Sequence, residues 1–486
     1  MSREAVHVVG SGPNGLAAAI VLAKAGVPVR VHEAQPTLGG SARSAALTLP
    51  GYVHDRCSGI HPLGIGSPFF STLPLRQHGL EWIHPSAPCA HPLDDGTAVI
   101  CERSVDATAE GLGPDAKAYR DLFAPLASAW PELAEDLLQP ILHIPRHPLR
   151  LARFGWAARR SARGLAFSLF RGERARALFA GMAAHSVLPL EALPASVFGL
   201  ILTASAHAVG WPLPRGGAQH ISDALAAHLR GLGGDIQLGD EVTELERFGN
   251  DTVLLDLTPR QVERLAGPRL PEAYRGRLRR FRYGPGAFKL DWALDGPIPW
   301  RAHECTRAGT VHIGGSFDEI AQSERAVTEG RPSARPFVLL AQHTLFDPSR
   351  APDGRHTAWA YCHVPNGWTV DMTEAIEAQI ERFAPGFGKR ILARHAISPA
   401  NLEAENANLV GGDITGGSQD LAQLLARPRL WGSPYATPDP RIFLCGASTP
   451  PGAGVHGMCG WHAARTVLAR NGPALRTLRA SAKGPT

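Results

Sequence analysis

Short apolar runs and one glycine-rich turn alternate at the start of the chain. Residues 5–9 (AVHVV) form an apolar run typical of a buried strand, and residues 16–25 (LAAAIVLAKA) form a longer run typical of a helix. Gly26 ends the helical pattern, and a second strand pattern over 27–32 (VPVRVH) is followed by Glu33. This order of strand, glycine turn, helix and strand predicts a βαβ unit.

The pattern changes along the rest of the chain. Helical spacing with proline breaks covers about 115–208, whereas strand patterns dominate after 283. The sequence predicts helices over 221–230 and 457–470, the second ended by Asn471, Gly472 and Pro473, and strands over 236–245, 252–257, 287–294, 310–313, 337–341, 357–363 and 441–445. The alternation of strands and helices predicts an α/β fold class.

The composition excludes several classes of protein. Of the 486 residues, 44% are hydrophobic and 19% are charged, which is enough apolar material for a large core. A net charge of +5 without a matching motif predicts no nucleic-acid partner. The seven cysteines lack CxxC spacing, and Pro145 separates His143 from His147, so we expect no disulfide framework and no metal site. A reducing, cytoplasmic location fits best.

The turn at residues 10–15 (GSGPNG) is the strongest chemical signal in the sequence. Gly10 allows a tight turn, Gly12 lets the backbone approach a pyrophosphate, and Gly15 lets the helix pack closely on the strand. A helix N-terminus attracts anions, and Glu33 can accept hydrogen bonds from a ribose. We therefore predict a dinucleotide site formed by Gly10, Gly12, Pro13, Asn14, Gly15 and Glu33.

A second glycine pair follows Glu33 closely. Gly39 and Gly40 lie in the stretch AQPTLGGSARS, where a pair of glycines lets a further piece of backbone lie against the cofactor. Arg43 comes three residues later and can reach a phosphate. The alternative is an ordinary surface loop.

These motifs, with the segment 214–219 (PRGGAQ) and the segment 444–460 (LCGASTPPGAGVHGMCG), resemble the glutathione-reductase-type FAD superfamily. The resemblance is to its amine oxidase and phytoene desaturase branch, and it touches both ends and the middle of the chain. It implies a Rossmann-type FAD/NAD(P)-binding domain with an interleaved α+β substrate domain. It also implies FAD as the cofactor, with contacts from Val242, Gly446, Val455, His456 and Met458.

The resemblance also implies a division of the chain. We expect a discontinuous FAD-binding domain over 1–65, 212–283 and 430–475, and a substrate domain over 66–211 and 284–429. The helical insertion would lie near 105–210, and 476–486 would be a flexible tail.

Four side chains are candidates for catalysis. The resemblance implies a lysine that holds a water at flavin N5, and Lys289, one of only five lysines, lies in a matching segment (GPGAFKLDW); the alternative is a solvated strand lysine. Asp55 and His61, with His54, lie in the segment 50–61, which the resemblance places beside the isoalloxazine ring, or they are a turn cap and structural histidines. His456 either donates a hydrogen bond to the flavin or satisfies a buried carbonyl.

The resemblance implies an FAD-dependent oxidoreductase that transfers hydride between a hydrophobic small molecule and flavin N5, as in desaturation or saturation. O2 or a quinone is the expected acceptor, because no second GxGxxG lies between a strand and a helix. Two alternatives stay open. One is a flavin amine oxidase using O2, with Tyr361 and Trp461 available for an aromatic cage; the other is a structural-FAD protein or a redox-neutral flavin isomerase.

The segment 146–176 combines nine arginines with interleaved aromatic and aliphatic residues. It is a candidate surface for peripheral contact with an anionic membrane, which would suit an enzyme that takes an apolar substrate from lipid. The alternative is a solvated helical face in an arginine-rich protein.

Overall fold

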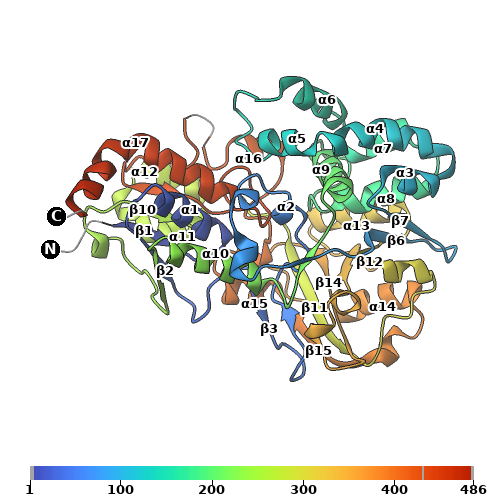
Figure 1. Ribbon diagram of the computed structural model, residues 1–486. Coiled ribbons are helices and arrows are strands. Elements are labelled where there is room, and N and C mark those ends of the chain that lie inside the picture. The colour runs from blue at the N-terminus through green and yellow to red at the C-terminus, as the bar shows by residue number, and fades with distance from the viewer. Residues whose placement is uncertain (1–4, 430–431, 483–486) are drawn as a thin grey trace.

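The computed structural model describes residues 5–429 and 432–482 and contains two large sheets (Figure 1). The first sheet has five strands in the order β16-β10-β1-β2-β9, and all neighbouring pairs are parallel. Its strands are β1 (Val6–Val9), β2 (Val29–Glu33), β9 (Asp235–Leu238), β10 (Val253–Leu255) and β16 (Ile442–Leu444).

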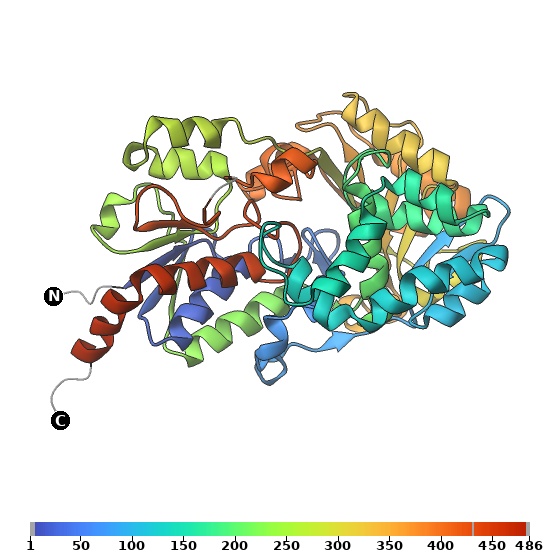
Figure 2. The same cartoon turned by 90° about the horizontal axis from the view of Figure 1, so that it is seen from above.

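Helices cover both faces of this parallel sheet, which explains why its inner strands β1 and β10 and the edge strand β16 are fully buried and nearly all apolar, whereas the edge strand β9 is half-buried or exposed. Leu254 and Phe443 face the cluster formed by α1 (Pro13–Lys24), α10 (Gln219–Gly231) and α17 (Met458–Ala482). Val253 and Leu255 point the other way, into the cluster that includes α11 (Pro259–Ala266) and α12 (Glu272–Arg279). Figure 2 shows these two helix layers on opposite sides of the sheet.

The second sheet has seven strands in the order β15-β11-β14-β13-β12-β6-β7. The β6–β12 pair is parallel, and the other neighbours are antiparallel. The strands are β6 (Ala87–Pro92), β7 (Ala98–Cys101), β11 (Gly286–Leu294), β12 (Ala308–Ile313), β13 (Val338–Ala341), β14 (His356–Val364) and β15 (Ile391–Ile397).

Many of the remaining helices pack on the two faces of this second sheet. One cluster joins residues of β6 and β13 to the helices between Val105 and Ala208, and another joins the opposite face to α14. The helices are α2 (Pro62–Ile65), α3 (Val105–Glu110), α4 (Ala116–Ser128), α5 (Trp130–Leu137), α6 (Pro148–Ala158), α7 (Ala162–Leu169), α8 (Glu173–Ala184), α9 (Ala195–Ala208), α13 (Phe317–Thr328), α14 (Thr373–Phe383), α15 (Pro399–Glu405) and α16 (Leu421–Leu425).

Two short antiparallel strand pairs complete the structure: β3 (Ser44–Ala45) with β4 (His54–Asp55), and β5 (Trp82–Ile83) with β8 (Leu213–Pro214). Within the described ranges, no helix is both long and apolar enough to cross a bilayer.

The predicted fold class is confirmed: a Rossmann-like parallel sheet is joined to a second, mixed sheet. Two predicted boundaries are wrong. The strand predicted over 236–245 ends at Leu238, before Gly239, which has a φ of +66°. The last helix continues through Asn471, Gly472 and Pro473 to Ala482, so only 483–486 of the predicted tail lie outside the described residues, as do 430–431. The domain boundaries stay a prediction.

Candidate functional site

A single elongated cavity of about 730 Å³ contains most of the predicted site. Residues after β1, β2 and β10 line one end of it, and β11, β12, β13 and β14 contribute side chains to the other end. The cavity therefore lies at the carboxyl ends of the parallel strands, where α/β folds bind their ligands.

The glycine turn forms a cradle in which no side chain could fit. A Cβ on Gly15 would lie 2.2 Å from the Gly10 carbonyl oxygen, and a Cβ on Gly40 would lie 3.2 Å from Gly12 Cα. Gly12 is the N-cap of α1 and supplies no capping side chain. Gly10, Gly12, Pro13, Asn14 and Gly40 line the cavity, so the backbone is open to a ligand at the helix N-terminus.

Glu33 and Arg43 flank this cradle. Glu33 accepts hydrogen bonds from the Ser11 backbone N–H (2.9 Å) and hydroxyl (2.7 Å), which fixes its carboxylate at the cavity wall. Arg43 donates from Nε to the Gly40 carbonyl (2.7 Å) and also lines the cavity. One acidic and one basic side chain are thus held beside the helix N-terminus.

Asp256 is a site residue that the sequence reading missed. It directly follows β10, lines the cavity, and accepts a hydrogen bond from the Gly15 N–H at 2.9 Å. Burial raises the pKa of Asp256 to about 7, opposed by the Gly15 hydrogen bond and reinforced by the charge of Glu33. An acid at the end of a buried strand (TVLLD) is the signal that could have revealed it.

The cofactor contacts implied by the resemblance separate into two groups. Val242, Gly446 and Val455 line the cavity, whereas His456 and Met458 lie behind its wall, as does Gly39 of the early motif. His456 is fully buried, and its Nδ1 accepts a hydrogen bond from the Met458 N–H at 3.0 Å. Burial lowers the pKa of His456 to about 4, so it is a neutral cap at the start of α17.

Lys289 lies on β11 in the wall of the cavity and is 3% exposed. Its Nζ donates to both carboxylate oxygens of Asp291, two residues along the same face of the strand. Its Nζ also lies 5.6 Å from the centre of the Trp359 ring. Burial raises the pKa of Asp291 to about 6 despite the opposing charge of Lys289. The lysine is therefore half of a buried ion pair and is not solvated.

Of the other predicted catalytic residues, His61 faces the cavity and Asp55 does not. The Nε2 of His61 is buried without a hydrogen-bond partner among the described residues, and burial lowers the pKa of His61 to about 4. His54 is also buried, with Nδ1 3.6 Å from Asp291 Oδ1, and burial lowers its pKa to about 3.

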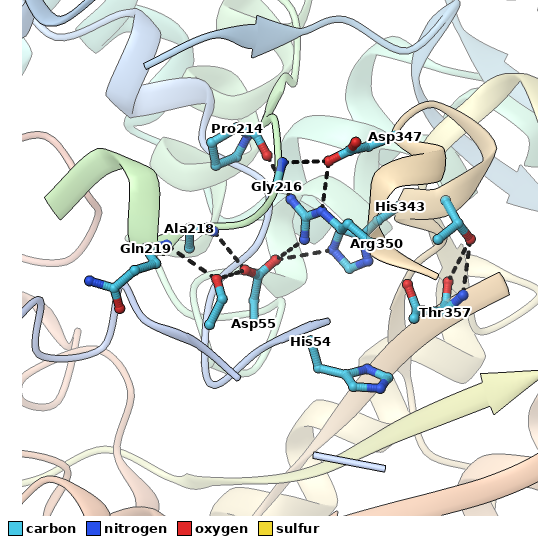
Figure 3. A network of polar contacts seen from close by, with 12 residues as sticks. His54, Asp55, Pro214, Gly216, Ala218, Gln219, His343, Asp347, Arg350 and Thr357 are labelled. Carbon is cyan, nitrogen blue, oxygen red and sulfur yellow. Dashed lines mark hydrogen bonds and ion pairs between the residues drawn. The ribbon is translucent and has the colours of Figure 1, made fainter. Parts of the chain in front are cut away.

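Asp55 belongs to a buried network on the far side of β4 (Figure 3). It accepts from the Ala218 N–H (2.7 Å), the Ser44 hydroxyl (2.7 Å) and Arg350 Nη1 (2.6 Å). Arg350 also pairs with Asp347 at 3.0 Å. Burial alone would raise the pKa of Asp55, but Arg350, His343 and the two other donors hold it below its usual range. Asp55 is placed to position the chain rather than to exchange protons with a ligand.

The other end of the cavity crosses the second sheet. In the strand register, Lys289 is opposite Tyr361, Tyr361 is opposite Leu339, and Leu339 is opposite His312. These four residues form one row across four strands. The cavity follows that row and is lined along it by Lys289, Trp359, Tyr361, Leu339, Thr310, His185, Trp211, Leu202 and Val187.

The aromatic residues named from sequence are not brought together. Tyr361 lines the cavity and stacks on Trp359, with ring centres 5.8 Å apart and planes at 25°. Trp461 lies on α17, outside the cavity lining, and its ring is covered by Arg465. Among the described residues, no cluster of three or more histidine, cysteine, aspartate or glutamate side chains could hold a metal ion.

Comparison with protein families gives one match that covers most of the chain. The profile of a family described as flavin containing amine oxidoreductase matches residues 14–468. The phytoene dehydrogenase of Streptomyces griseus is 27% identical over 443 residues, covering 82% of this chain and 83% of its own. The pyridine nucleotide-disulfide oxidoreductase domain-containing protein 2 of Rattus norvegicus is 25% identical, covering 95% of this chain and 92% of its own.

Solved structures show the same fold. A putrescine oxidase with bound putrescine aligns with a TM-score of 0.60 at 18% identity, covering 96% of this chain and 99% of its own. The cyclohexylamine oxidase of Brevibacterium oxydans aligns with a TM-score of 0.58 at 16% identity, covering 98% and 100%. The resemblance predicted from the sequence motifs is therefore confirmed at the level of the family and the fold.

Proposed function

Because the chain belongs to the flavin-containing amine oxidoreductase family, we propose that it binds FAD and transfers hydride between a hydrophobic small molecule and flavin N5. One observation carries this proposal: a single cavity joins the glycine cradle to Lys289 and continues along the second sheet. We call this continuation the apolar arm; it is lined by Trp359, Tyr361, Leu339, Leu202 and Trp211. O2 or a quinone is the proposed electron acceptor.

The residues at the cradle fit FAD. Gly12 and Gly40 line the cavity at the start of α1, where a helix N-terminus favours an anion such as a pyrophosphate, and Gly15 lets α1 pack closely on the turn at Gly10. Asn14 Oδ1 is buried without a partner among the described residues and lines the same wall. Glu33, Arg43 and Val242 line the same cavity, and we propose that they contact the ribose, a phosphate and the adenine, respectively.

When bound, FAD supplies the two-electron chemistry, with N5 as the atom that accepts or gives hydride. The role we propose for Lys289 is to hold a water or a reacting group at that position, and Asp291 fixes the direction of its Nζ. We propose that His61, which stays neutral, offers Nε2 as a hydrogen-bond partner to the substrate or the flavin. His456 and Asp55 act through the backbone elements that they hold.

The apolar arm supports a hydrophobic substrate. The acids among the described lining residues all lie outside the row from Tyr361 to Leu339, so no lining acid along that row could balance a substrate ammonium group. These acids are Glu33, Asp240, Glu241, Asp256 and Glu405. A neutral substrate avoids the cost of burying an uncompensated charge.

A stopped-flow experiment tests the proposal. The purified protein is loaded with FAD, reduced anaerobically and mixed with aerated buffer, and the return of oxidised flavin absorbance is followed. If Lys289 assists oxygen, Lys289→Met slows reoxidation by roughly 10²-fold, whereas Lys389→Met, which removes an exposed lysine, leaves it unchanged. Slow reoxidation in the wild type points instead to a quinone, tested in the same instrument. A protein that takes up no FAD would overturn the proposal.

A second candidate is a flavin amine oxidase, favoured by Lys289 and by the stacked pair Trp359–Tyr361 in the cavity wall. It predicts hydrogen peroxide production with a primary or secondary amine. Absence of turnover across a panel of aliphatic and aromatic amines, with rapid reoxidation by O2 retained, would remove this candidate.

A further inference from the structure

The far end of the apolar arm contains polar groups that the protein itself does not satisfy. Thr310, on β12, is 4% exposed and lines the cavity, and its Oγ1 is buried with no partner among the described residues. Leaving a buried hydroxyl unsatisfied costs free energy, so such a group in a cavity wall points to a ligand.

His185, on the loop after α8, lines the cavity with Thr310 and is held from behind. Its Nε2 lies 2.9 Å from Nε2 of His312, whose Nδ1 lies 3.3 Å from Cys89 Sγ. Trp211 packs edge-on against the His185 ring at 5.4 Å. These contacts fix the ring and use one of its nitrogens, while Nδ1 of His185 has no hydrogen-bond partner in the described part of the chain.

Thr310 and His312 lie two residues apart on the same face of β12. His312 ends the row that begins with Lys289, and Thr310 ends the neighbouring row, which begins with Asp291. Three strand spacings of about 4.8 Å separate β11 from β12, so this end lies about 14 Å from Lys289. Tyr361 and Leu339 fill the row between them.

Among the described residues that line this end, none carries a charge for an ionic head group, and the nearby Glu324 and His363 pair with each other at 2.8 Å outside the lining. The lining cations are Arg43 and Arg264 at the cradle and Lys289, which already pairs with Asp291. Burial lowers the pKa of His185 to about 3 and holds the pKa of His312 well below its usual value, so both rings are neutral. A ligand oxygen that donates or accepts, with no net charge, matches a neutral imidazole and a hydroxyl.

We propose that the substrate is an elongated neutral molecule whose far end carries a hydroxyl or carbonyl oxygen, held by Thr310 and His185 about 14 Å from Lys289. The inference rests on the proposed function, which puts the reacting end of the substrate beside Lys289. It adds to that function a class of substrate and the residues that select it.

Equilibrium dialysis with gas-chromatographic detection tests this selection on the full chain. The probes are 1-decanol, decane, decanoate and decylamine. We expect 1-decanol to bind roughly ten-fold more tightly than each of the other three, because it alone is neutral and has an oxygen at one end.

Thr310→Val keeps the shape of the side chain and removes the hydroxyl, and we expect it to weaken 1-decanol binding roughly five-fold without changing decane binding. His185→Phe should act in the same direction. Thr357→Val is the matched control, since Thr357 Oγ1 is also buried and unsatisfied but does not line the cavity.

Equal affinity for 1-decanol and decane, tighter binding of either ion, or an unchanged Thr310→Val variant would overturn the inference. The flavin absorbance of the same samples separates this result from a failure of the proposed function. Yellow protein without preference for the alcohol overturns only the substrate class, whereas protein that takes up no FAD overturns the proposed function while the dialysis still reports on Thr310 and His185.

Discussion

The Asp256 carboxyl group lies at the N-terminus of α1, which favours negatively charged groups. It accepts from the Gly15 N–H at the start of α1, where the pyrophosphate of FAD is proposed to bind. Glu33, Cys445 and Cys459 are the other titratable groups around it. With a pKa raised to about 7 by burial, Asp256 is neutral in weak acid and negative in weak base.

We therefore predict that FAD affinity depends on pH. A bound pyrophosphate favours the protonated form of Asp256, so FAD binding takes up a proton above pH 7 and weakens by up to about ten-fold per pH unit. Asp256→Asn should bind FAD tightly with little pH dependence. Titration of the FAD-free protein with FAD between pH 6 and pH 9, followed by flavin fluorescence, measures this.

The matched control is Asp240→Asn. Asp240 also lines the cavity, but hydrogen bonds from Arg247 and His32 lower its pKa to about 2, so it stays ionised throughout the titration. Its removal should leave the pH slope intact. A wild-type affinity that is constant from pH 6 to pH 9 would contradict the role of Asp256.

Lys289 and Asp291 also predict a stability effect. Both side chains are buried and pair with each other, so removing one charge leaves the other without a partner. We expect Asp291→Asn to lower the free energy of unfolding by about 3–5 kcal/mol, and the double variant Lys289→Met with Asp291→Asn to recover most of that loss. Urea unfolding midpoints measure both. If the single and double variants are equally destabilised, the charges of Lys289 and Asp291 do not depend on each other for stability.

At the scale of elements, α6 and the loop before it expose unusually large apolar side chains. Ile144 is 93% exposed, Leu149 85% and Trp156 70%, and Arg153 and Arg159 lie among them. Arg159 covers the Trp156 ring at 3.8 Å. α6 packs on α9, which lines the cavity through Leu202. We propose that this face contacts anionic lipid.

The surface formed by Ile144, Leu149 and Trp156 predicts co-sedimentation with vesicles that contain phosphatidylserine. Replacing all three by serine removes the apolar contact and should abolish binding at low salt. Leu421→Ser, at a 47% exposed leucine on α16, is the control and should bind like wild type. Wild-type protein that stays in the supernatant at low salt would rule out the membrane contact.

The elements that the sequence revealed are those whose apolar pattern is continuous. β1 and β10 of the parallel sheet are buried on both faces, so VHVV and VLL stand out without any knowledge of their partners. β15 was missed because it alternates half-buried and exposed residues and contains Arg394 and His395. β6 was missed because two prolines and a histidine interrupt its apolar run.

The cradle could be predicted from sequence because its residues are local. Gly10 to Gly15 and Glu33 are joined by one βαβ unit, whose geometry is fixed by the turn. The apolar arm could not be predicted from sequence, because Thr310, Leu339 and Tyr361 come close to one another only through the pairing of β12, β13 and β14. Asp55 shows the same limit: the sequence placed it near the cofactor, but only Arg350, far along the chain, reveals that its carboxylate is already occupied.

At the scale of the whole molecule, the Asp55 network ties three distant segments together. Arg350 Nη1 pairs with Asp55, its Nη2 donates to the Pro214 carbonyl, and Asp347 accepts from the Gly216 N–H. Figure 3 shows these contacts between β4, the turn before α10 and the loop before β14. The network lies between the N-terminal motif and the second sheet.

We predict that Arg350→Met destabilises the protein by about 3–5 kcal/mol at pH 7, because Asp55 and Asp347 stay buried without their counter-charge. Since the pKa of Asp55 is held low in the folded state, its stabilising effect is present above about pH 4 and is lost as the pH falls further. The difference from wild type should therefore shrink at pH 3.

Urea unfolding at pH 7 and pH 3 measures both values. Arg215→Met is the matched control, because it breaks an exposed pair with Glu81 and should cost at most about 1 kcal/mol at either pH. An Arg350→Met variant as stable as wild type at pH 7 would show that the network contributes no net stability.

The interleaving of the chain has a consequence for its biosynthesis. In the parallel sheet, only β10 separates β1 from β16, although β16 follows β1 and β10 at a long distance along the chain. α17, which packs on α1, follows it. During translation, the part of α1 that packs on α17 therefore has no partner helix until the residues after Met458 have been made. A nascent chain that stops before Ile442 therefore lacks β16, the edge strand of the five-stranded parallel sheet.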